Sequence, residues 1–212
     1  MKIDNNQKGV LLKPKILSIF IYFLIIIFLM SCGGVPPTYY YRIDYQMTKL
    51  ESGSSPIPIT LGIKQFEADI LYEEDRIVYR NSPYEVQYYH YRRWIAPPRK
   101  MVKEKIIEQF SSSGIFERVI GLPSHTQPDY VLQGKIKAFE EWDEDGSWYG
   151  LVTLSFELQK SETKEIIWEK TFSEKTPASK KEPVDVVKAI SNSMQKVVQQ
   201  AIIEIEQELK ST

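Results

Sequence analysis

Residues 130–160, YVLQGKIKAFEEWDEDGSWYGLVTLSFELQK, decide the fold of this chain. Alternate positions from Leu132 to Ala138 are apolar or small, and the second half of the stretch repeats this alternation. A period of two is typical of a strand that buries one face. Asp145-Gly146, between the halves, is a pair that favours a two-residue hairpin turn. The stretch therefore predicts two long antiparallel strands.

The residues that follow extend this sheet and then cover it. Residues 166–172 (IIWEKTF) predict a third antiparallel strand, which completes a meander. In residues 183–210, apolar side chains recur every three or four positions, as in an amphipathic helix. This stripe is short for a coiled coil, and the sheet needs a cover. We therefore expect the helix to pack on the sheet.

The part of the chain before the meander predicts further strands and one more helix. Apolar alternation and turn residues place strands at 57–66, 71–80, 84–94 and 115–120. Pro97-Pro98 starts a helix and Gly114 ends it, since proline suits a first helical turn and glycine a C-terminal cap. The predicted fold is α/β: a single domain with a mixed β-sheet that includes an antiparallel meander, packed by two main helices.

The amino terminus has the three zones of a bacterial secretory signal. A basic segment precedes the uncharged apolar residues 16–30, and small residues follow. The apolar run is shorter than the about 20 residues that a membrane-spanning helix needs. Leu29-Met30-Ser31-Cys32 fits a lipobox, in which Cys32 is lipidated after cleavage; the alternative is a plain signal or an uncleaved anchor. We predict a signal peptide at 1–31, a lipidated tether at 32–58 and a domain at 59–212.

The residues after Cys32 indicate which membrane holds the domain and how it is attached. Gly33 is not the aspartate typical of inner-membrane retention, so we expect the outer membrane, with the domain facing the periplasm. The tether is rich in Gly, Ser and Pro, which limit regular structure. Within it, residues 39–45 contain four tyrosines. They predict an extended segment docked on the domain, and the alternative is contact with lipid headgroups.

Charge and cysteine content exclude some classes of protein. Removing residues 1–31 takes four lysines and one aspartate from the 27 basic and 28 acidic residues, which leaves a net charge of −4. This balance argues against nucleic-acid binding, which needs a basic surface. Cys32 is the only cysteine, so the chain forms no internal disulfide and its fold depends on packing.

Motifs for catalysis, metals and nucleotides are missing from the sequence. Glu141, Asp143 and Asp145 resemble the start of a calcium loop, but its last ligand position holds Val152, so a solvated hairpin tip is the better interpretation. The two histidines do not form a zinc-binding pair. Serine-hydrolase and nucleotide-binding motifs are absent. We predict no catalytic residues, no metal and no cofactor.

One segment is rich in the residue types that dominate protein interfaces. The predicted strand 84–94 combines tyrosines, arginines and a tryptophan. On strict alternation both of its faces carry aromatic side chains, which suggests that one face is buried and the other makes contacts. The predicted partner-binding residues are Tyr84, Tyr89, Tyr91, Arg93 and Trp94; an edge hairpin with one buried face is the alternative.

Six short segments resemble the ABC-type transport auxiliary lipoprotein family, the accessory lipoproteins of MCE-type lipid transport systems. The segments are Tyr40-Tyr41-Arg42-Ile43, 59–63, 76–80, 88–94 with Ala96-Pro97-Pro98, 116–119, and 129–134 with Phe139-Glu140. The acidic stretch before Gly146 departs from the family pattern. The resemblance implies a non-enzymatic subunit whose partners are an MCE-domain protein and an ABC permease and ATPase complex. It is compatible with a homo-oligomer.

A second function remains open from the sequence. A stand-alone envelope lipoprotein that binds a small ligand or an envelope polymer would show the same signal and the same absence of catalytic motifs. Adjacent genes for a permease, an ATPase and an MCE protein would favour the transport function, and their absence would favour the second.

Overall fold

The computed structural model of the protein describes residues 18, 22, 34–47 and 55–211. The chain divides into two compact units, Met1–Pro37 and Thr38–Thr212. In the first unit, Ser18 and Tyr22 are helical and residues 34–37 lack regular structure. Cys32 lies outside the described residues, so its lipidation stays a prediction. Within the ranges that are described, no helix combines the length and the apolar character needed to cross a membrane.

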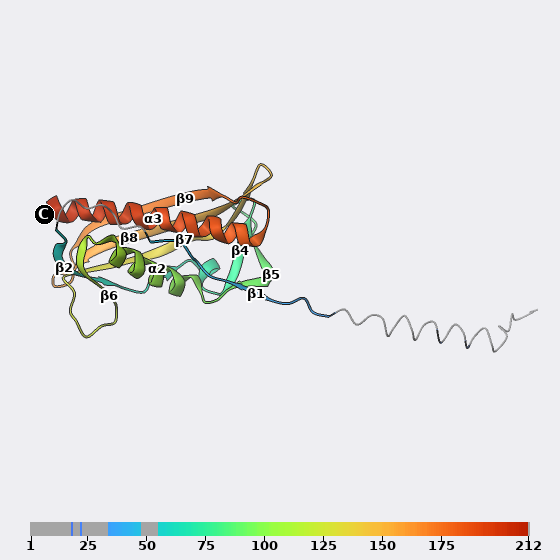
Figure 1. Cartoon of the computed structure of the whole chain (residues 1–212), viewed down its shortest axis with the longest axis horizontal. Helices are drawn as coiled ribbons and strands as arrows, with labels where there is room; N and C mark the ends of the chain where they lie inside the picture. Colours follow the sequence, from blue (N-terminus) through green and yellow to red (C-terminus); the bar gives the residue numbers. More distant parts are fainter. Residues whose placement is uncertain (1–17, 19–21, 23–33, 48–54, 212) are drawn as a thin grey trace, which may run out of the picture. The chain divides into compact units, whose positions relative to one another are not determined.

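The long strands of the second unit form a three-stranded antiparallel meander (Figure 1). It consists of β7 (Tyr130–Glu144), β8 (Ser147–Lys160) and β9 (Ile166–Pro177). Asp145 and Gly146 at the β7–β8 turn have φ angles of 49° and 70°, as a tight hairpin turn requires. The predicted meander is confirmed, but β9 runs five residues past Phe172. Its last residues, Ser173-Glu174-Lys175-Thr176, carry no apolar alternation from which the extension could be predicted.

The other edge of β7 pairs with three short strands in succession. β2 (Ile57–Ile63) lies parallel to Tyr130–Leu132, β3 (Glu67–Ala68) to Lys135–Ile136 and β4 (Arg76–Arg80) to Glu140–Trp142. The two ends of β7 therefore carry different neighbours. β6 (Phe116–Gly121) pairs with β2 at one end. β5 (Gln87–Trp94) and β1 (Tyr39–Tyr41) extend β4 at the other end.

We call β4, β5 and β1 the arm. β5 runs antiparallel to β4, and β1 runs parallel to β5. The described residues thus form a curled mixed sheet of nine strands, and the predicted α/β class with a mixed sheet is confirmed.

Two helices cover this sheet. α2 (Pro98–Ser113) packs on β6, and Gly114 ends it with a φ of 74°. α3 (Pro183–Ser211) crosses β8 and β9 and buries the apolar stripe predicted from its sequence. A Cβ atom at Gly150 of β8 would lie 2.2 Å from the backbone nitrogen of Ile190, so α3 approaches the sheet here more closely than any side chain would permit. Both predicted main helices are thus present.

The region before β4 differs from its prediction. Residues 71–80 were expected to be one strand, but Ile70–Tyr72 form a 3₁₀ helix, η1, and only Arg76–Arg80 form β4. The intervening Glu73-Glu74-Asp75 provide no apolar alternation. Tyr72 is nevertheless buried, because its hydroxyl donates a hydrogen bond to the buried Glu140. A tertiary contact of this kind overrides the local pattern.

Part of the segment predicted as a tether lies in the same unit as the sheet. Tyr39–Tyr41 form strand β1, and residues 38–47 belong to the same compact unit as the sheet. The four tyrosines therefore mark a docked segment, as the first of the two alternatives predicted. The part of residues 32–58 that precedes the fold ends at Pro37.

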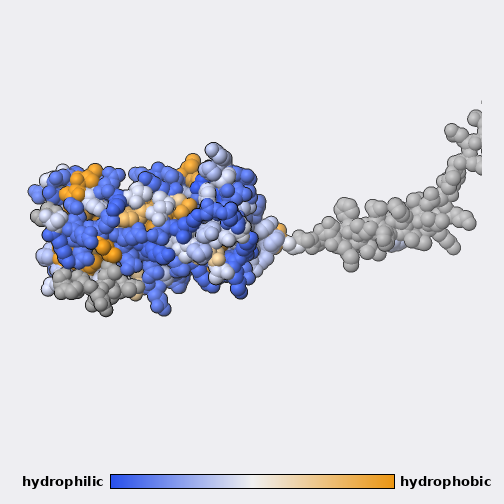
Figure 2. Space-filling view, turned by 90° about the horizontal axis from the view of Figure 1, so that it is seen from above, coloured by the Kyte–Doolittle hydropathy of each residue, from blue (hydrophilic) through white to orange (hydrophobic). Residues whose placement is uncertain are grey.

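The surface is mainly hydrophilic on the face seen in Figure 2, where apolar residues form small separate patches. Such scattered apolar residues are normal for the surface of a folded domain. On this face the protein presents no broad apolar area, so its polar and aromatic groups are the better candidates for recognition.

Candidate partner-binding surface

An open groove of about 410 Å³ lies on the arm, where β4 and β5 pair. Its lining includes Tyr88, Tyr89 and His90 of β5 together with Arg93. The predicted alternation would have placed Tyr88 and Tyr89 on opposite faces. The pairing of β4 with β5 shifts register between Arg76 and Val78, which breaks strict alternation and lets neighbouring side chains line one groove.

The five predicted contact residues fall into three environments. Tyr84, in the turn before β5, is 95% exposed, and Tyr91 is 42% exposed. Tyr89 and Arg93 line the groove and are held by partners within the domain. Trp94 is only 1% exposed, and its ring packs 5.2 Å from that of Phe139. The inclusion of Trp94 in a contact surface is therefore wrong, because its side chain belongs to the core.

The arginines of the groove are oriented by contacts within the arm. An Nη atom of Arg93 lies 2.8 Å from a carboxylate oxygen of Asp75. The guanidinium of Arg76 lies 4.0 Å from the centre of the Tyr88 ring and pairs with Glu74 at 2.8 Å. Such stacking and pairing restrict a long side chain to one geometry. The groove thus presents cations and aromatic rings that are already positioned.

A buried carboxylate holds the arm to the meander. Glu140 of β7 is fully buried and accepts hydrogen bonds from the Tyr72 hydroxyl at 2.7 Å and from Arg80 Nε at 2.9 Å. A second Arg80 nitrogen pairs with its other oxygen, which makes the contact bidentate. The hydrogen bond to Glu140 raises the pKa of Arg80, and burial raises the pKa of Tyr72. The charge of Glu140 is therefore fully compensated.

A second buried carboxyl group lies beside the first and is less well compensated. Glu141 accepts a hydrogen bond of 2.8 Å from the Tyr89 hydroxyl. Its other oxygen and one oxygen of Asp143 are also buried, and the two carboxyl groups interact with each other. Burial, followed by the charge of Asp143, raises the pKa of Glu141 to about 8 against the opposing effect of Tyr89. Burial thus favours the protonated form of Glu141.

These two glutamates correct the prediction of a solvated hairpin tip. Residues 144–147 are exposed there, whereas Glu140 and Glu141 are buried. Consecutive buried residues arise because both faces of β7 are covered where the arm joins it. A run of acidic residues gives no signal of this, since their partners Tyr72, Arg80 and Tyr89 are more than fifty residues away.

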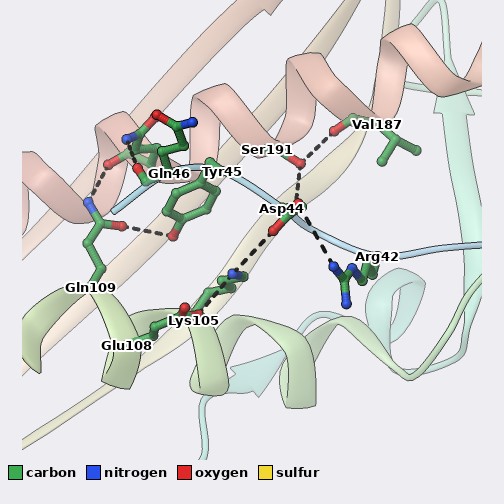
Figure 3. A network of polar contacts seen from close by, with 10 residues as sticks. Arg42, Asp44, Tyr45, Gln46, Lys105, Glu108, Gln109, Val187 and Ser191 are labelled. Carbon is green, nitrogen blue, oxygen red and sulfur yellow. Dashed lines mark hydrogen bonds and ion pairs between the residues drawn. The ribbon is translucent and has the colours of Figure 1, made fainter. Parts of the chain in front are cut away.

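The segment after β1 lies between the two helices (Figure 3). We call residues 42–46 the strap. The Asp44 amide donates to Ser191 Oγ of α3 at 3.2 Å, and the Tyr45 hydroxyl donates to Gln109 Oε1 of α2 at 2.8 Å. Ile43, directly before Asp44, is buried in the core. The strap thus connects both helices to the start of the domain.

Two glutamines complete the connection. Gln109 of α2 donates to the carbonyl oxygen of Gln195 on α3 at 2.9 Å, and Gln195 donates to the carbonyl oxygen of Gln46 at 2.8 Å. The two helices are therefore joined both directly, by the bond from Gln109 to Gln195, and through the strap (Figure 3). The point at which the chain enters the domain is fixed by the fold itself.

The described part of the chain gives little support for a metal site. There, no three His, Cys, Asp or Glu side chains come together as metal ligands would. Another groove, of about 710 Å³, lies at the opposite end of β7, beside Pro58, Asp129 and Lys160. The Asp129 carboxylate is already used there, since it accepts a hydrogen bond of 2.7 Å from the Thr60 amide.

Comparison with known proteins identifies relatives. The family model described as "ABC-type transport auxiliary lipoprotein component" matches residues 42–201. These residues run from the strap into α3, so the match includes β4 and β5 of the arm, the meander, α2 and most of α3, and leaves out β1. A search of curated proteins found no match to the chain.

Two solved structures share the fold. A Xanthomonas campestris protein of the family DUF330 is 20% identical, has a TM-score of 0.73 and aligns over 82% of this chain and 98% of its own. The crystal structure of a second, uncharacterized protein is 15% identical, has a TM-score of 0.65 and aligns over 80% of this chain and 99% of its own. At these identities the likeness extends to the fold alone.

Proposed function

Because the chain belongs to the ABC-type transport auxiliary lipoprotein component family, we propose that it is the non-enzymatic accessory subunit of an MCE-type ABC transporter. The transporter would move lipids between the membranes of the cell envelope. Family membership already associates the chain with an ABC transporter and with the envelope. The finer elements are the MCE-domain partner, the anchor at Cys32 and the outer membrane.

The groove on the arm is the observation that supports docking to a protein partner. Its aromatic rings and arginines are ordered before binding, so less side-chain entropy is lost when a partner covers them. Tyr84 and Tyr91 extend beyond the groove with exposed rings. Tyrosine gives a large contact area together with a hydroxyl that can bond to a partner.

The test uses Tyr84 and Tyr91, because Tyr89 and Arg93 have partners inside the domain whose loss would also affect stability. We expect Tyr84→Ser combined with Tyr91→Ser to abolish co-purification of the full lipidated chain with the MCE protein. The melting temperature should not change, since both rings are exposed. The control is Ile203→Ser, which removes an exposed apolar side chain of α3, outside the arm.

Unchanged co-purification of the double variant would reject the arm as the docking surface. Mass spectrometry of the purified protein would report the acyl group on Cys32 in the same experiment. Recovery of acylated protein without any transporter subunit would favour the stand-alone lipoprotein, for which the groove of about 710 Å³ at the other end of β7 is the place to seek a ligand.

A further inference from the structure

The outer edge of the arm combines exposed aromatic, apolar and cationic side chains. Tyr39 and Tyr40 of β1 are 54% and 64% exposed, and Ile95, just after β5, is 65% exposed. Arg92 lies 5.7 Å from the centre of the Tyr39 ring, and the Arg42 side chain is exposed. We call these five residues the edge patch. They do not line the groove proposed for the protein partner.

The edge patch is the part of the domain that the chain reaches first. β1 starts at Tyr39, and Ile95 is tied to it by a hydrogen bond of 2.8 Å from its amide to the Tyr41 carbonyl oxygen. Only residues 33–38 separate β1 from Cys32. Seven residue steps span at most about 25 Å when fully extended. An acyl chain on Cys32 would therefore keep β1 within this distance of the bilayer.

The strap keeps the chain between Cys32 and the domain short. Ile43 is buried and residues 44–46 bond to α2 and α3, so even if β1 left β5, the tether could not lengthen beyond Arg42 without breaking core contacts. A long flexible tether would let the domain present any face to the bilayer. A short tether attached at a fixed strand favours one orientation.

The chemistry of the edge patch suits the headgroup layer of a membrane. Tyrosine is enriched at membrane interfaces because its ring is apolar and its hydroxyl is polar, and arginine pairs with lipid phosphates. Among the described residues, β1 pairs only with β5, which leaves its outer backbone groups without strand partners. Such groups are satisfied among hydrated headgroups and not in hydrocarbon.

We propose that the edge patch rests on the phospholipid headgroups of the membrane that holds the protein, so that the groove on the adjoining part of the arm is held at a fixed height above the bilayer. The proposal rests on the lipidation of Cys32 proposed above. Its occupant is a phospholipid surface, with Tyr39 and Tyr40 at the interface and Arg42 and Arg92 directed to the phosphates.

The test uses the full lipidated protein in vesicles of phosphatidylethanolamine and phosphatidylglycerol that contain a phospholipid with a photoreactive headgroup. After illumination, mass spectrometry locates the residues bound to lipid. We expect crosslinks at residues 39–42 and 92–95, and several-fold fewer at residues 124–127 and 161–165, near the other end of β7. Equal crosslinking at both ends, or crosslinking only at the far end, would overturn the proposal.

Two variants sharpen the result. Tyr39→Ser combined with Tyr40→Ser should reduce crosslinking at residues 92–95 several-fold, whereas Ile166→Ser, which removes an exposed apolar side chain at the start of β9, should leave it unchanged. An equal reduction by both variants would contradict a specific role for the tyrosines. Protein that lacks an acyl group and is not retained by the vesicles would instead reject the lipid anchor, and with it the premise of the proposal.

Discussion

The meander and the arm belong to the same sheet, but they differ in the length of their strands and in the interactions that hold them in place. The three meander strands have 15, 14 and 12 residues and pair along almost their whole length, whereas the arm strands have 5, 8 and 3. Phe156 of the meander packs its ring 5.5 Å from Phe66 and 6.1 Å from Phe172. In the arm, the junction with β7 combines apolar packing, as of Trp94 on Phe139, with buried carboxyl groups that have tyrosine and arginine partners.

This difference suits the meander to stabilising the fold and the arm to recognition. Apolar burial is not directional and tolerates many sequences, so it suits a scaffold. Buried polar contacts require particular partners at particular distances, and they fix the geometry of what they support. The arm carries the groove and the edge patch, and its polar junction holds both in place.

The largest expected effect belongs to the meander. Phe156→Ala removes a fully buried ring between two other rings and leaves a cavity. We expect the free energy of unfolding to fall by about 3 to 5 kcal/mol. Urea unfolding followed by circular dichroism would measure the loss. The control is Thr153→Ala on the same strand, whose hydroxyl contacts Ser173 at the surface and whose loss should cost about 0.5 kcal/mol or less.

A smaller effect is expected at the junction of the arm. Glu140→Gln preserves the shape of the side chain but leaves Arg80 without a charged partner in a largely buried site. We expect the free energy of unfolding to fall by about 2 to 3 kcal/mol. The same substitution at Glu74, which pairs with Arg76 at the surface, should cost about 0.5 kcal/mol or less. Equal losses at both sites would show that the buried network contributes no more than a surface ion pair.

Most of the meander could be predicted from the sequence, because its information is local. Alternation along β7 and β8 and the pair Asp145-Gly146 determine two strands and the turn that joins them. The stripe on α3 likewise follows from spacing within one helix. The end of β9 was not predicted, because its side chains are polar and the strand is defined there only by its pairing with β8.

The arm could be predicted only in part, because its contacts join residues far apart in sequence. The tyrosines of residues 39–45 indicated a docked segment, but nothing local indicates that the strap passes between α2 and α3. Tryptophan is a residue type that is enriched at interfaces, but Trp94 lies in the core. Conversely, the charges of Glu140 and Glu141 suggested exposure, and long-range partners bury both.

The last prediction concerns Glu141 and the pH dependence of stability. Burial raises the pKa of Glu141 from 4.5 to about 8, so the folded protein binds a proton there that the unfolded chain has already lost. Stability should therefore fall as pH rises from about 5 to about 8, by at most about 1.4 kcal/mol per pH unit for one proton, and level off outside this range. Urea unfolding at several pH values within the range would measure the slope.

Glu141→Gln should remove most of this slope, because glutamine occupies the same space without ionising. The control is Glu144→Gln, an exposed position on the same strand, which should keep the slope of the unmodified protein. A pH dependence that survives in the Glu141 variant would assign it to another group, of which Asp143 is the nearest, since burial raises the pKa of Asp143 in the same direction. Loss of the slope would assign the pH dependence of stability to Glu141, whose carboxyl group accepts a hydrogen bond from Tyr89 of the groove.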